Sequence, residues 1–272
     1  MLYVTQKTFE HGNKAGRLLA YITRAESTPI SIPRILTSMN QISDVPQDIT
    51  DAFLSFYRDL YTSRADYSET QLSDYLDQIT LPRLKDRVRE ELEEPLSVEE
   101  LTLAISQMPA HKSPGLDGFP VEWYKQFQHL LGPLLLKTYN EALKEGRLPP
   151  SMREALIVLL LKPRKDPLKC DSYRPISLIN VDAKILAKAL ANRLNKVIAR
   201  LVGSDQGGFI PGRSTRMNIR RLFHNLSYTH DCPSTRAVVS LDTCKAFDSV
   251  EWPYLFRVLQ LYGFGPRLIA WI

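Results

Sequence analysis

The order in which helical and strand patterns occur along the chain limits its fold more than any other feature. Apolar residues recur at helical spacing from Ile49 onward and through 68–94, well before any strand pattern appears. Short continuous apolar runs, typical of strands, come later and lie far apart, at Ala155–Leu161, 176–179 and 237–241. This order excludes a regular alternation of strands and helices and also an all-β fold, so the sequence predicts an α+β architecture.

Local start and stop signals define several of the helices. Ser97 and Glu100 form a capping-box pattern, which predicts a helix of about three turns that ends near Pro109. Pro133 suits the first position of a helix, and Gly146 suits the residue that follows its end. Single helices are predicted over about 49–60, 97–108, 120–130, 133–145, 182–201, 215–228 and 249–262, and further helices are predicted to fill 68–94.

The strands are expected to lie in the interior. Ala155–Leu161 is predicted to be buried on both faces and to pair with 176–179. The run 237–241 is predicted to be a buried strand that ends at Asp242. Residues 1–48 mix polar residues with prolines and keep no period, so we expect a loosely ordered segment with room for one short helix.

Charge is distributed unevenly along the chain. Residues 1–96 carry 11 basic and 15 acidic side chains, whereas 97–272 carry 24 basic and 15 acidic ones. The excess of positive charge in the second part favours a polyanionic partner. A solvated basic surface would produce the same count, so charge by itself leaves both interpretations open.

The cysteines and the hydropathy pattern exclude other classes of protein. Cys170, Cys232 and Cys244 show neither the spacing of a zinc site nor that of a disulfide framework, which fits a reducing compartment. The longest apolar run, Ala155–Leu161, is far too short to span a bilayer, and the first twenty residues have no apolar core. We therefore expect a protein that is neither secreted nor embedded in a membrane.

The segment 240–250, Ser-Leu-Asp-Thr-Cys-Lys-Ala-Phe-Asp-Ser-Val, places Asp242 where the predicted strand turns into a helix. A carboxylate in that position can bind a divalent metal ion. Enzymes that join nucleotides use two such ions about 3.5–4 Å apart, held by acidic residues on two strands. Alternatively, Asp242 caps a helix and Asp248 interacts with the helix dipole. The segment by itself does not decide between these interpretations.

Other motifs precede this segment in a fixed order. They are Lys-Ser-Pro-Gly-Leu-Asp-Gly-Phe at 112–119, Leu-Lys-Pro-Arg-Lys-Asp at 161–166, Ser-Tyr-Arg-Pro-Ile-Ser-Leu at 172–178, Asp-Ala-Lys-Ile-Leu at 182–186 with Asn-Arg-Leu at 192–194, and Asp-Gln-Gly-Gly-Phe-Ile-Pro-Gly-Arg at 205–213. In their order and spacing the sequence resembles the reverse transcriptases of LINE-type non-LTR retrotransposons, over about 90–272. The resemblance implies a mostly helical linker over 1–95, followed over 96–272 by the fingers and partial palm of a right-hand polymerase.

The resemblance assigns roles around the incoming nucleotide. It implies that Asp242 is a catalytic, metal-binding aspartate, with the carbonyl group of Thr243 as a further metal ligand. Phe247 matches the aromatic steric gate that excludes a 2′-hydroxyl, although core packing is the alternative for this ring. Arg174 and Lys162 match the cations that bind the triphosphate.

Further residues are implied around the phosphates and the nucleic acid. Lys245 is expected to add to the triphosphate pocket. The side chains expected to face template and primer are Arg164, Lys165, Gln206, Gly208 and Arg213. The cations at 162–165 flank a proline, so a simple turn is the alternative there. In the motif at 112–119, Gly115, Asp117 and Gly118 are expected to form a structural turn rather than a catalytic element.

The implied activity is RNA-directed DNA polymerisation, with an RNA template, a DNA primer, deoxynucleoside triphosphates and two Mg²⁺ ions, in the nucleus and cytoplasm as a ribonucleoprotein. The family also has an Asp-Asp dipeptide farther downstream, and this sequence contains none. We therefore expect a chain cut off before that motif and inactive by itself. A noncatalytic module that binds RNA or primer-template is the main alternative. The pattern Gly-x-x-x-x-Gly-Arg-Ser at 207–214 resembles a phosphate-binding loop only superficially, because Arg213 replaces its lysine.

Overall fold

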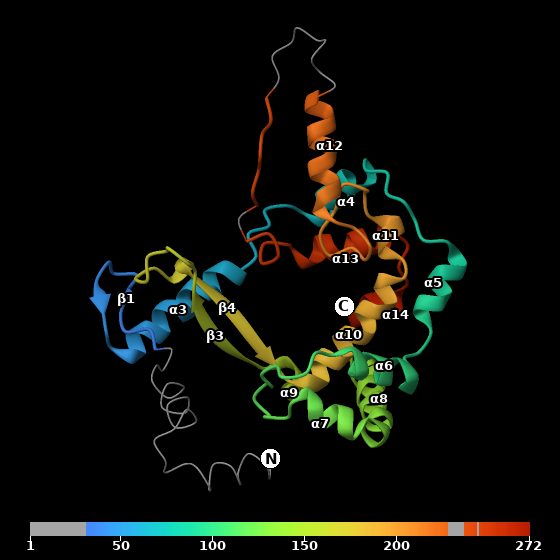
Figure 1. Cartoon of the computed structure of the whole chain (residues 1–272), viewed down its shortest axis with the longest axis horizontal. Coiled ribbons are helices and arrows are strands. Elements are labelled where there is room, and N and C mark those ends of the chain that lie inside the picture. Colours follow the sequence, from blue (N-terminus) through green and yellow to red (C-terminus); the bar gives the residue numbers. More distant parts are fainter. Residues whose placement is uncertain (1–30, 228–236, 244) are drawn as a thin grey trace. The chain divides into compact units, whose positions relative to one another are not determined.

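A computed structural model describes residues 31–227, 237–243 and 245–272. The chain divides into two compact units, one formed by Met1–Asp59 and Leu161–Arg174, the other by Leu60–Leu160 and Pro175–Ile272. Helices and two two-stranded sheets make up the regular structure of the described residues, which confirms the α+β prediction (Figure 1). None of the helices described is long and apolar enough to cross a bilayer. The predicted domain boundary after residue 95 stays a prediction.

The first unit consists of a hairpin, most of one helix and a loop. Strands β1 (Ile35–Leu36) and β2 (Ile42–Ser43) pair antiparallel, and α3 (Pro46–Tyr61) follows. The amide of Leu36 donates to the carbonyl oxygen of Leu168 at 2.8 Å, and the rings of Phe53 and Tyr173 meet edge to face at 5.2 Å. The loop 161–174 thus folds onto the hairpin and α3. Sequence periodicity does not predict this hairpin, and residues 1–30 lie outside the described part of the chain.

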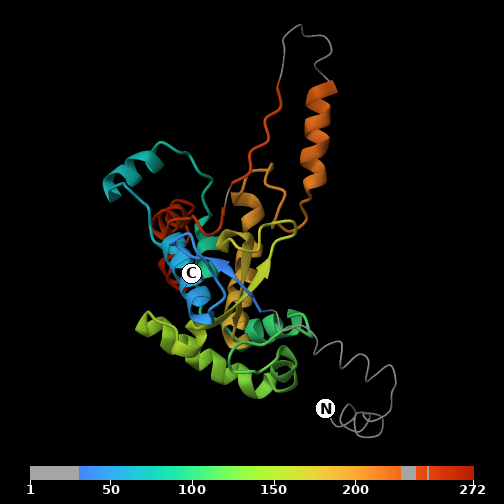
Figure 2. The same cartoon turned by 90° about the vertical axis from the view of Figure 1, so that its left-hand side faces the viewer.

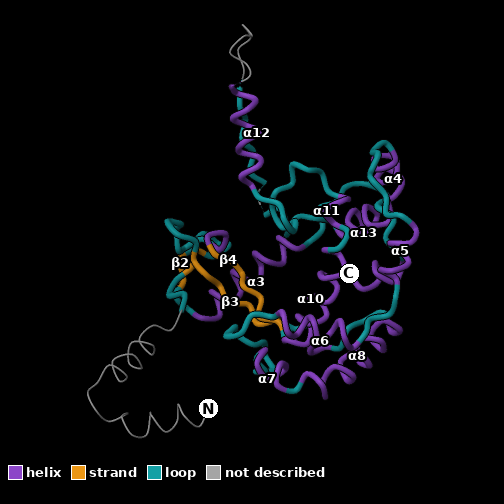
Figure 3. Tube along the Cα trace, turned by 45° about the vertical axis from the view of Figure 1, so that its right-hand side comes forward, coloured by secondary structure: helices purple, strands orange, loops and turns teal. Residues whose placement is uncertain are grey.

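The second unit is built on packed helices. They are α4 (Glu69–Asp77), α5 (Asp86–Glu93), α6 (Val98–Gln107), α7 (Val121–Gln126), α8 (Gln128–Glu145), α9 (Pro150–Arg153), α10 (Val181–Asn195), α11 (Ile198–Leu201), α12 (Thr215–Ser227), α13 (Trp252–Leu261) and α14 (Pro266–Trp271). Helix α6 packs against both α8 and α10 (Figure 3). Leu101, Ile105, Tyr139 and Ile185 are fully buried at these contacts. In contrast, no residue of α12, orange in Figure 2, is buried.

The predicted strand Ala155–Leu161 forms with the predicted bounds as β3, and it pairs with β4 (Tyr173–Ile179). A short 3-10 helix, Cys170–Ser172, precedes β4. The expectation that β3 is buried on both faces is wrong, because none of its residues is buried. Burial requires a layer on each face of a sheet, and the local sequence of a strand does not specify what covers it.

The helix signals are largely correct, although several bounds differ from the prediction. Gly146 caps α8 in the left-handed conformation, with φ 65° and ψ 18°, as predicted. However, α8 begins at Gln128 and Pro133 lies inside it, since the apolar stripe continues upstream and Leu131 packs against the core. The predicted helix 182–201 is interrupted before α11, because buried Val197 adopts a non-helical φ of −122°. Helix α13 starts at Trp252, with a proline in its first turn.

The predicted strand at 237–241 is wrong. These residues form no strand, and Leu241 is 91% exposed. A strand is stable only when its backbone groups pair with a neighbouring strand, and none of the strands in the described ranges pairs with this segment. The apolar composition of 237–241 indicates a preference for an extended chain but supplies no partner.

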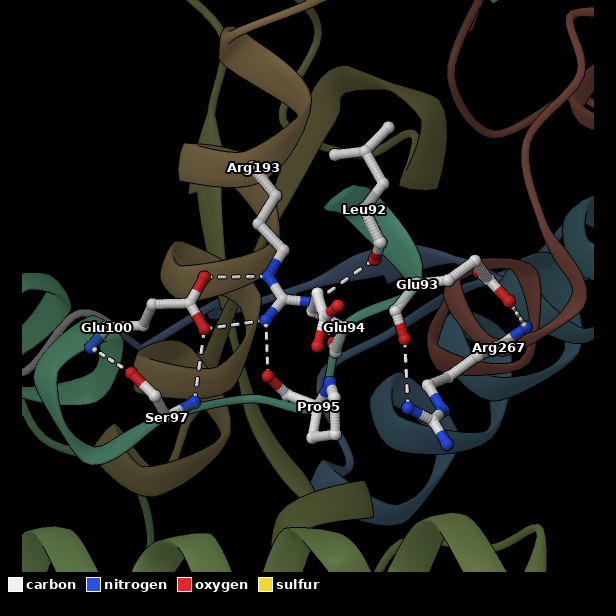
Figure 4. Close-up of polar contacts among 8 residues, drawn as sticks. All are labelled: Leu92, Glu93, Glu94, Pro95, Ser97, Glu100, Arg193 and Arg267. Carbon is white, nitrogen blue, oxygen red and sulfur yellow. Dashed lines mark hydrogen bonds and ion pairs between the residues drawn. The ribbon is translucent and has the colours of Figure 1, made fainter. Parts of the chain in front are cut away.

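A buried arginine joins three parts of the second unit. The guanidinium group of Arg193, on α10, donates hydrogen bonds of 2.7 and 2.6 Å to the carboxylate of Glu100 on α6. It also donates to three carbonyl oxygens within 92–95 (Figure 4). Burial alone would raise the pKa of Glu100, but hydrogen bonds from Arg193 and Ser97 outweigh burial and lower it. Arg193 therefore fixes the segment between α5 and α6 against α10.

The same segment also holds the start of α14. The carboxylate of Glu93 accepts hydrogen bonds from the amides of Arg267 at 2.9 Å and Leu268 at 2.8 Å. These amides lie in the first turn of α14, where helical amides lack partners within the helix. The segment 92–100 therefore connects α5, α6, α10 and α14.

The capping box of α6 provides a first test of the fold. The Oγ atom of Ser97 accepts from the amide of Glu100 at 3.3 Å, and the amide of Ser97 donates to the Glu100 carboxylate at 3.1 Å. We expect Ser97→Ala to lower the free energy of unfolding by about 1 kcal/mol, the usual effect of losing a cap. Urea denaturation measures this. Ser106→Ala, in the last turn of α6, should change it by less than about 0.5 kcal/mol.

Candidate functional site

The basic loop, residues 161–174, carries four of the predicted site residues in the first unit. Lys162 follows β3 directly, and its Nζ atom donates to the carbonyl oxygen of Asp171 at 2.6 Å. The amide of Lys165 donates to the carbonyl oxygen of Lys162 at 3.2 Å, which closes a turn in which Arg164 has a φ of +60°. Arg164, Lys165 and Arg174 are exposed. The loop therefore presents cations to solvent from a backbone that its own hydrogen bonds fix.

The position of Arg174 follows from the alternation of side chains along β4. The preceding residue, Tyr173, is buried: its ring meets Phe53, and its hydroxyl group donates to the carbonyl oxygen of Pro167 at 2.8 Å. Successive side chains of a strand point to opposite faces, so Arg174 faces away from this contact. Packing of Tyr173 thus orients an exposed guanidinium group.

The loop after α11 holds Gln206, Gly208 and Arg213, which were predicted to face template and primer. The guanidinium group of Arg213 donates to the carbonyl oxygens of Ala199, Val202, Gly203 and Gln206, so it holds the end of α11 against the loop. The Nε2 atom of Gln206 donates to the carbonyl oxygen of Gly208 at 3.1 Å. Within this structure Arg213 and Gln206 shape the loop, and their contact with nucleic acid stays a prediction.

The same loop presents an aromatic residue that sequence reasoning missed. Phe209 is 89% exposed and has a φ of +60°, a conformation that costs energy for a bulky side chain. Its ring meets that of Phe247 edge to face, with centroids 5.9 Å apart. The sequence signal was present, since Phe209 follows two glycines within the motif at 205–213, but no role was predicted for it.

Asp242 and Phe247 lie on the segment 237–249 of the second unit. Asp242 and Thr243 are exposed, and Cys244 lies outside the described residues. Phe247 is 81% exposed, so its ring lies outside the core that the described residues form. The amide of Ser249 donates to the carbonyl oxygen of Lys245 at 3.1 Å and closes the turn that carries Phe247. Asp242 and Phe247 are therefore both accessible to a ligand.

The residues described do not by themselves form a metal centre. The carboxylate of Asp242 is a suitable ligand for a hard divalent cation. However, the structure brings together no group of three histidine, cysteine, aspartate or glutamate side chains within the ranges it describes. Asp242 and Thr243 thus supply at most part of a coordination shell, and their role as metal ligands stays a prediction.

The motif at 112–119 forms a structural turn, as predicted. The amide of Gly118, which has a φ of +74°, donates to the carbonyl oxygen of Gly115 at 3.2 Å. The amide of Asp117 donates to the Oδ1 atom of buried Asn180 at 3.3 Å, and the Nδ2 atom of Asn180 donates to the carbonyl oxygen of Ser151 at 2.9 Å. Asn180 thus links this turn to α9 and to the start of α10.

Comparisons with known proteins identify similar sequences. The profile of the family "Reverse transcriptase (RNA-dependent DNA polymerase)" matches residues 162–272. The chain is 38% identical over 228 residues to "Transposon TX1 uncharacterized 149 kDa protein" from Xenopus laevis, which covers 84% of this chain and 17% of that protein. It is 33% identical to "Probable RNA-directed DNA polymerase from transposon BS" from Drosophila melanogaster, over 57% of this chain and 17% of that protein.

A third relative extends this pattern. The chain is 28% identical over 182 residues to "RNA-directed DNA polymerase from mobile element jockey" from Drosophila funebris, which covers 66% of this chain and 20% of that protein. The chain thus spans about a fifth or less of the length of these relatives. Each of the three is similar to more than half of this chain.

Proposed function

We propose that residues 162–272, which match the reverse transcriptase family profile, form part of a LINE-type reverse transcriptase domain. In this proposal the chain contributes the fingers and part of the palm of an RNA-directed DNA polymerase. Its proposed ligands are an RNA template, a DNA primer and deoxynucleoside triphosphates. The proposed metal is Mg²⁺, with Asp242 and the carbonyl group of Thr243 among its ligands.

Each predicted site residue has a chemical role in this proposal. The guanidinium group of Arg174 binds the triphosphate through a planar pair of donors, and Lys162 and Lys245 add positive charge. Phe247 stands below the sugar, where its ring leaves no room for a 2′-hydroxyl. The residues Arg164, Lys165, Gln206, Gly208 and Arg213 lie along template and primer, where cations meet phosphate and glycine permits close approach.

The observation that carries the proposal is the free positive charge of the basic loop. Residues 161–174 contain five lysines and arginines against two aspartates. Within the part of the chain that the structure describes, Lys162, Arg164, Lys165 and Arg174 form no ion pair with a carboxylate. Phosphate can therefore bind them without displacing an acidic partner.

For the chain by itself, the proposal is binding rather than catalysis. Nucleotidyl transfer by two metal ions requires acidic ligands from more than one position, and the sequence contains no Asp-Asp dipeptide to join Asp242. The noncatalytic binding module, which is the alternative for the isolated chain, makes the same prediction for this polypeptide. A polymerase fragment and a noncatalytic module make different predictions only when further polypeptide supplies the remaining carboxylates, because only the polymerase fragment would then extend a primer.

We expect chain 1–272 to bind a fluorescent RNA-template/DNA-primer duplex and to bind it about 100-fold more weakly at 200 mM than at 50 mM salt, as about four phosphate contacts require. Fluorescence anisotropy across a salt series measures this. The double variant Arg164→Gln/Lys165→Gln should flatten the slope of log K against log salt by about 2, one for each phosphate that the variant no longer binds.

The control variant removes the same charge elsewhere. Arg83→Gln/Lys85→Gln lies at exposed positions before α5 and should leave the salt slope unchanged. Equal slopes for both double variants would show that the basic loop does not contact phosphate. In parallel, primer extension with Mg²⁺ and deoxynucleoside triphosphates should give no product; DNA synthesis by chain 1–272 would contradict the proposal that it binds without catalysis.

A further inference from the structure

Residues 245–249 form the exposed turn that carries Phe247. Lys245 has a φ of +50°, and the hydrogen bond from the Ser249 amide to the Lys245 carbonyl oxygen spans the turn. On one side, the Phe247 ring meets Phe209, which lies on a separate exposed loop.

Residues 61–64, which include the end of α3, contact the other side of this turn within the second unit. The hydroxyl group of Tyr61 forms a hydrogen bond with the carboxylate of Asp248, the residue next to Phe247. The carboxylate of Glu251 accepts from the Oγ atom of Ser63 at 2.8 Å and from the amide of Arg64 at 3.1 Å. Three hydrogen bonds therefore run from this short segment to two carboxylates that flank the end of the turn.

The two segments also enclose a shared cavity. It has a volume of about 570 Å³ and is lined by Leu60–Arg64 on one side and Asp248–Pro253 on the other. Glu251 precedes α13, and its carbonyl oxygen accepts from the amide of Leu255 at 3.0 Å in the first turn of that helix. The contact thus joins residues 61–64 to the start of α13, where the helical hydrogen bond from Leu255 holds the backbone of Glu251.

The hydroxyl group of Tyr61 and the carboxylate of Glu251 are both committed to this contact. Partial burial, followed by the charge of Asp248 and the hydrogen bond to it, raises the pKa of Tyr61. A phenol is protonated at neutral pH in any case, so the Tyr61 hydroxyl group can donate to the carboxylate. The side chain of Glu251 makes no cap hydrogen bond to α13, and its carboxylate is directed to Ser63 and Arg64 instead.

We propose that residues 61–64 are positioning residues that hold the Phe247 turn, and so set how strictly a 2′-hydroxyl is excluded from the nucleotide site. The proposal rests on the proposed function, because the role of Phe247 as a steric gate belongs to it. Residues 61–64 lie outside the matched family profile, which begins at residue 162. The linker before the polymerase domain would then contribute to substrate selection.

The first experiment tests the contact itself in chain 1–272. Tyr61→Phe removes only the hydroxyl group, and Glu251→Gln is a second variant that weakens both bonds to residues 63 and 64. Tyr75→Phe, at an exposed tyrosine on α4, is the matched control. In ring-labelled protein, the NMR signals of Phe247 should shift toward those of a free phenylalanine in both variants and stay unchanged in the control.

Hydrogen exchange gives the size of the effect. The Arg64 amide, which donates to Glu251, should exchange about fivefold faster in Glu251→Gln, as expected for the loss or weakening of one hydrogen bond. Unchanged Phe247 signals and unchanged exchange in both variants would overturn the proposal. A lower melting temperature without any change in the Phe247 signals would reduce residues 61–64 to a purely stabilising role and would overturn it as well.

The second experiment tests selection. Binding of deoxy- and ribonucleoside triphosphates to chain 1–272 is measured with primer-template and Ca²⁺. The preference for the deoxy form should fall about fivefold in Tyr61→Phe, with the affinity for primer-template unchanged. An unchanged preference alongside shifted Phe247 signals would refute the link to selection. If the unmodified chain binds no nucleotide, the proposed nucleotide site fails, and the NMR signals still decide whether residues 61–64 hold the turn.

Discussion

Replacing Arg193 with alanine should lower the free energy of unfolding by about 3–5 kcal/mol, the usual range for breaking a buried ion pair from one side. Arg193 is 4% exposed, and its guanidinium group donates to the carbonyl oxygens of Leu92, Glu94 and Pro95. Its loss leaves the partly buried Glu100 carboxylate without the cation that donates hydrogen bonds to it. Since domains are stable by about 5–15 kcal/mol, this change removes a large part of the total.

Urea denaturation followed by circular dichroism measures this loss, and two further variants show its cause. Arg200→Ala removes an exposed arginine on the neighbouring helix α11 and should cost less than about 0.5 kcal/mol. Arg193→Lys keeps the charge but cannot reproduce a planar fork with five donors, so it should recover less than half of the loss. A cost below about 1 kcal/mol for Arg193→Ala would show that the bonds drawn in Figure 4 contribute little.

Those helix ends of the second unit that depend on interactions between neighbouring residues are predictable from the sequence. The capping box at Ser97 and the glycine cap at Gly146 are interactions within one helical turn, so a few neighbouring residues determine them. The bounds of β3 were predicted for the same reason, since Lys162 and Pro163 end an unbroken apolar run. Each of these features depends on residues fewer than about ten positions apart.

Features that depend on distant residues were not predictable in this way. The bonds of Arg193 join positions about a hundred residues apart, and no pattern near Arg193 indicates that it is buried. The contact of Tyr61 with Asp248 spans an even longer stretch. The strand predicted at 237–241 is wrong for a related reason. Its local sequence favours an extended chain, but none of the described strands pairs with it.

The candidate site was predicted by motif rather than by geometry. The resemblance named Asp242, Phe247 and Arg174, and the structure leaves all three exposed. It did not predict that Arg213 would bind four carbonyl oxygens of α11 and the loop that follows it, nor that Phe209 would meet Phe247. A motif specifies which residue types occur at which positions. The hydrogen bonds and ring contacts of those residues depend on tertiary packing, which the motif does not describe.

A substitution in the motif at 112–119 should also cause a large loss of stability. We expect Gly115→Ala to lower the free energy of unfolding by about 3 kcal/mol, at the upper end of the usual cost of overpacking. A Cβ atom at Gly115 would lie 2.1 Å from the Oδ1 atom of Asn180, 2.5 Å from its backbone nitrogen and 2.6 Å from the carbonyl carbon of Ile179. Two of these three atoms belong to the backbone at the start of α10, so they cannot rotate away.

Thermal and urea denaturation of two further variants distinguish the backbone clash at Gly115 from left-handed strain and from a clash with the Asn180 side chain. Gly118→Ala has open space around its Cβ atom but a φ of +74°, so it should cost only about 1–2 kcal/mol of left-handed strain. Adding Asn180→Ala to Gly115→Ala removes the contact at 2.1 Å and leaves both backbone contacts, so it should not restore stability. Full recovery in that double variant would mean that the side chain of Asn180, rather than the backbone, limits how closely the turn at 112–119 approaches α10.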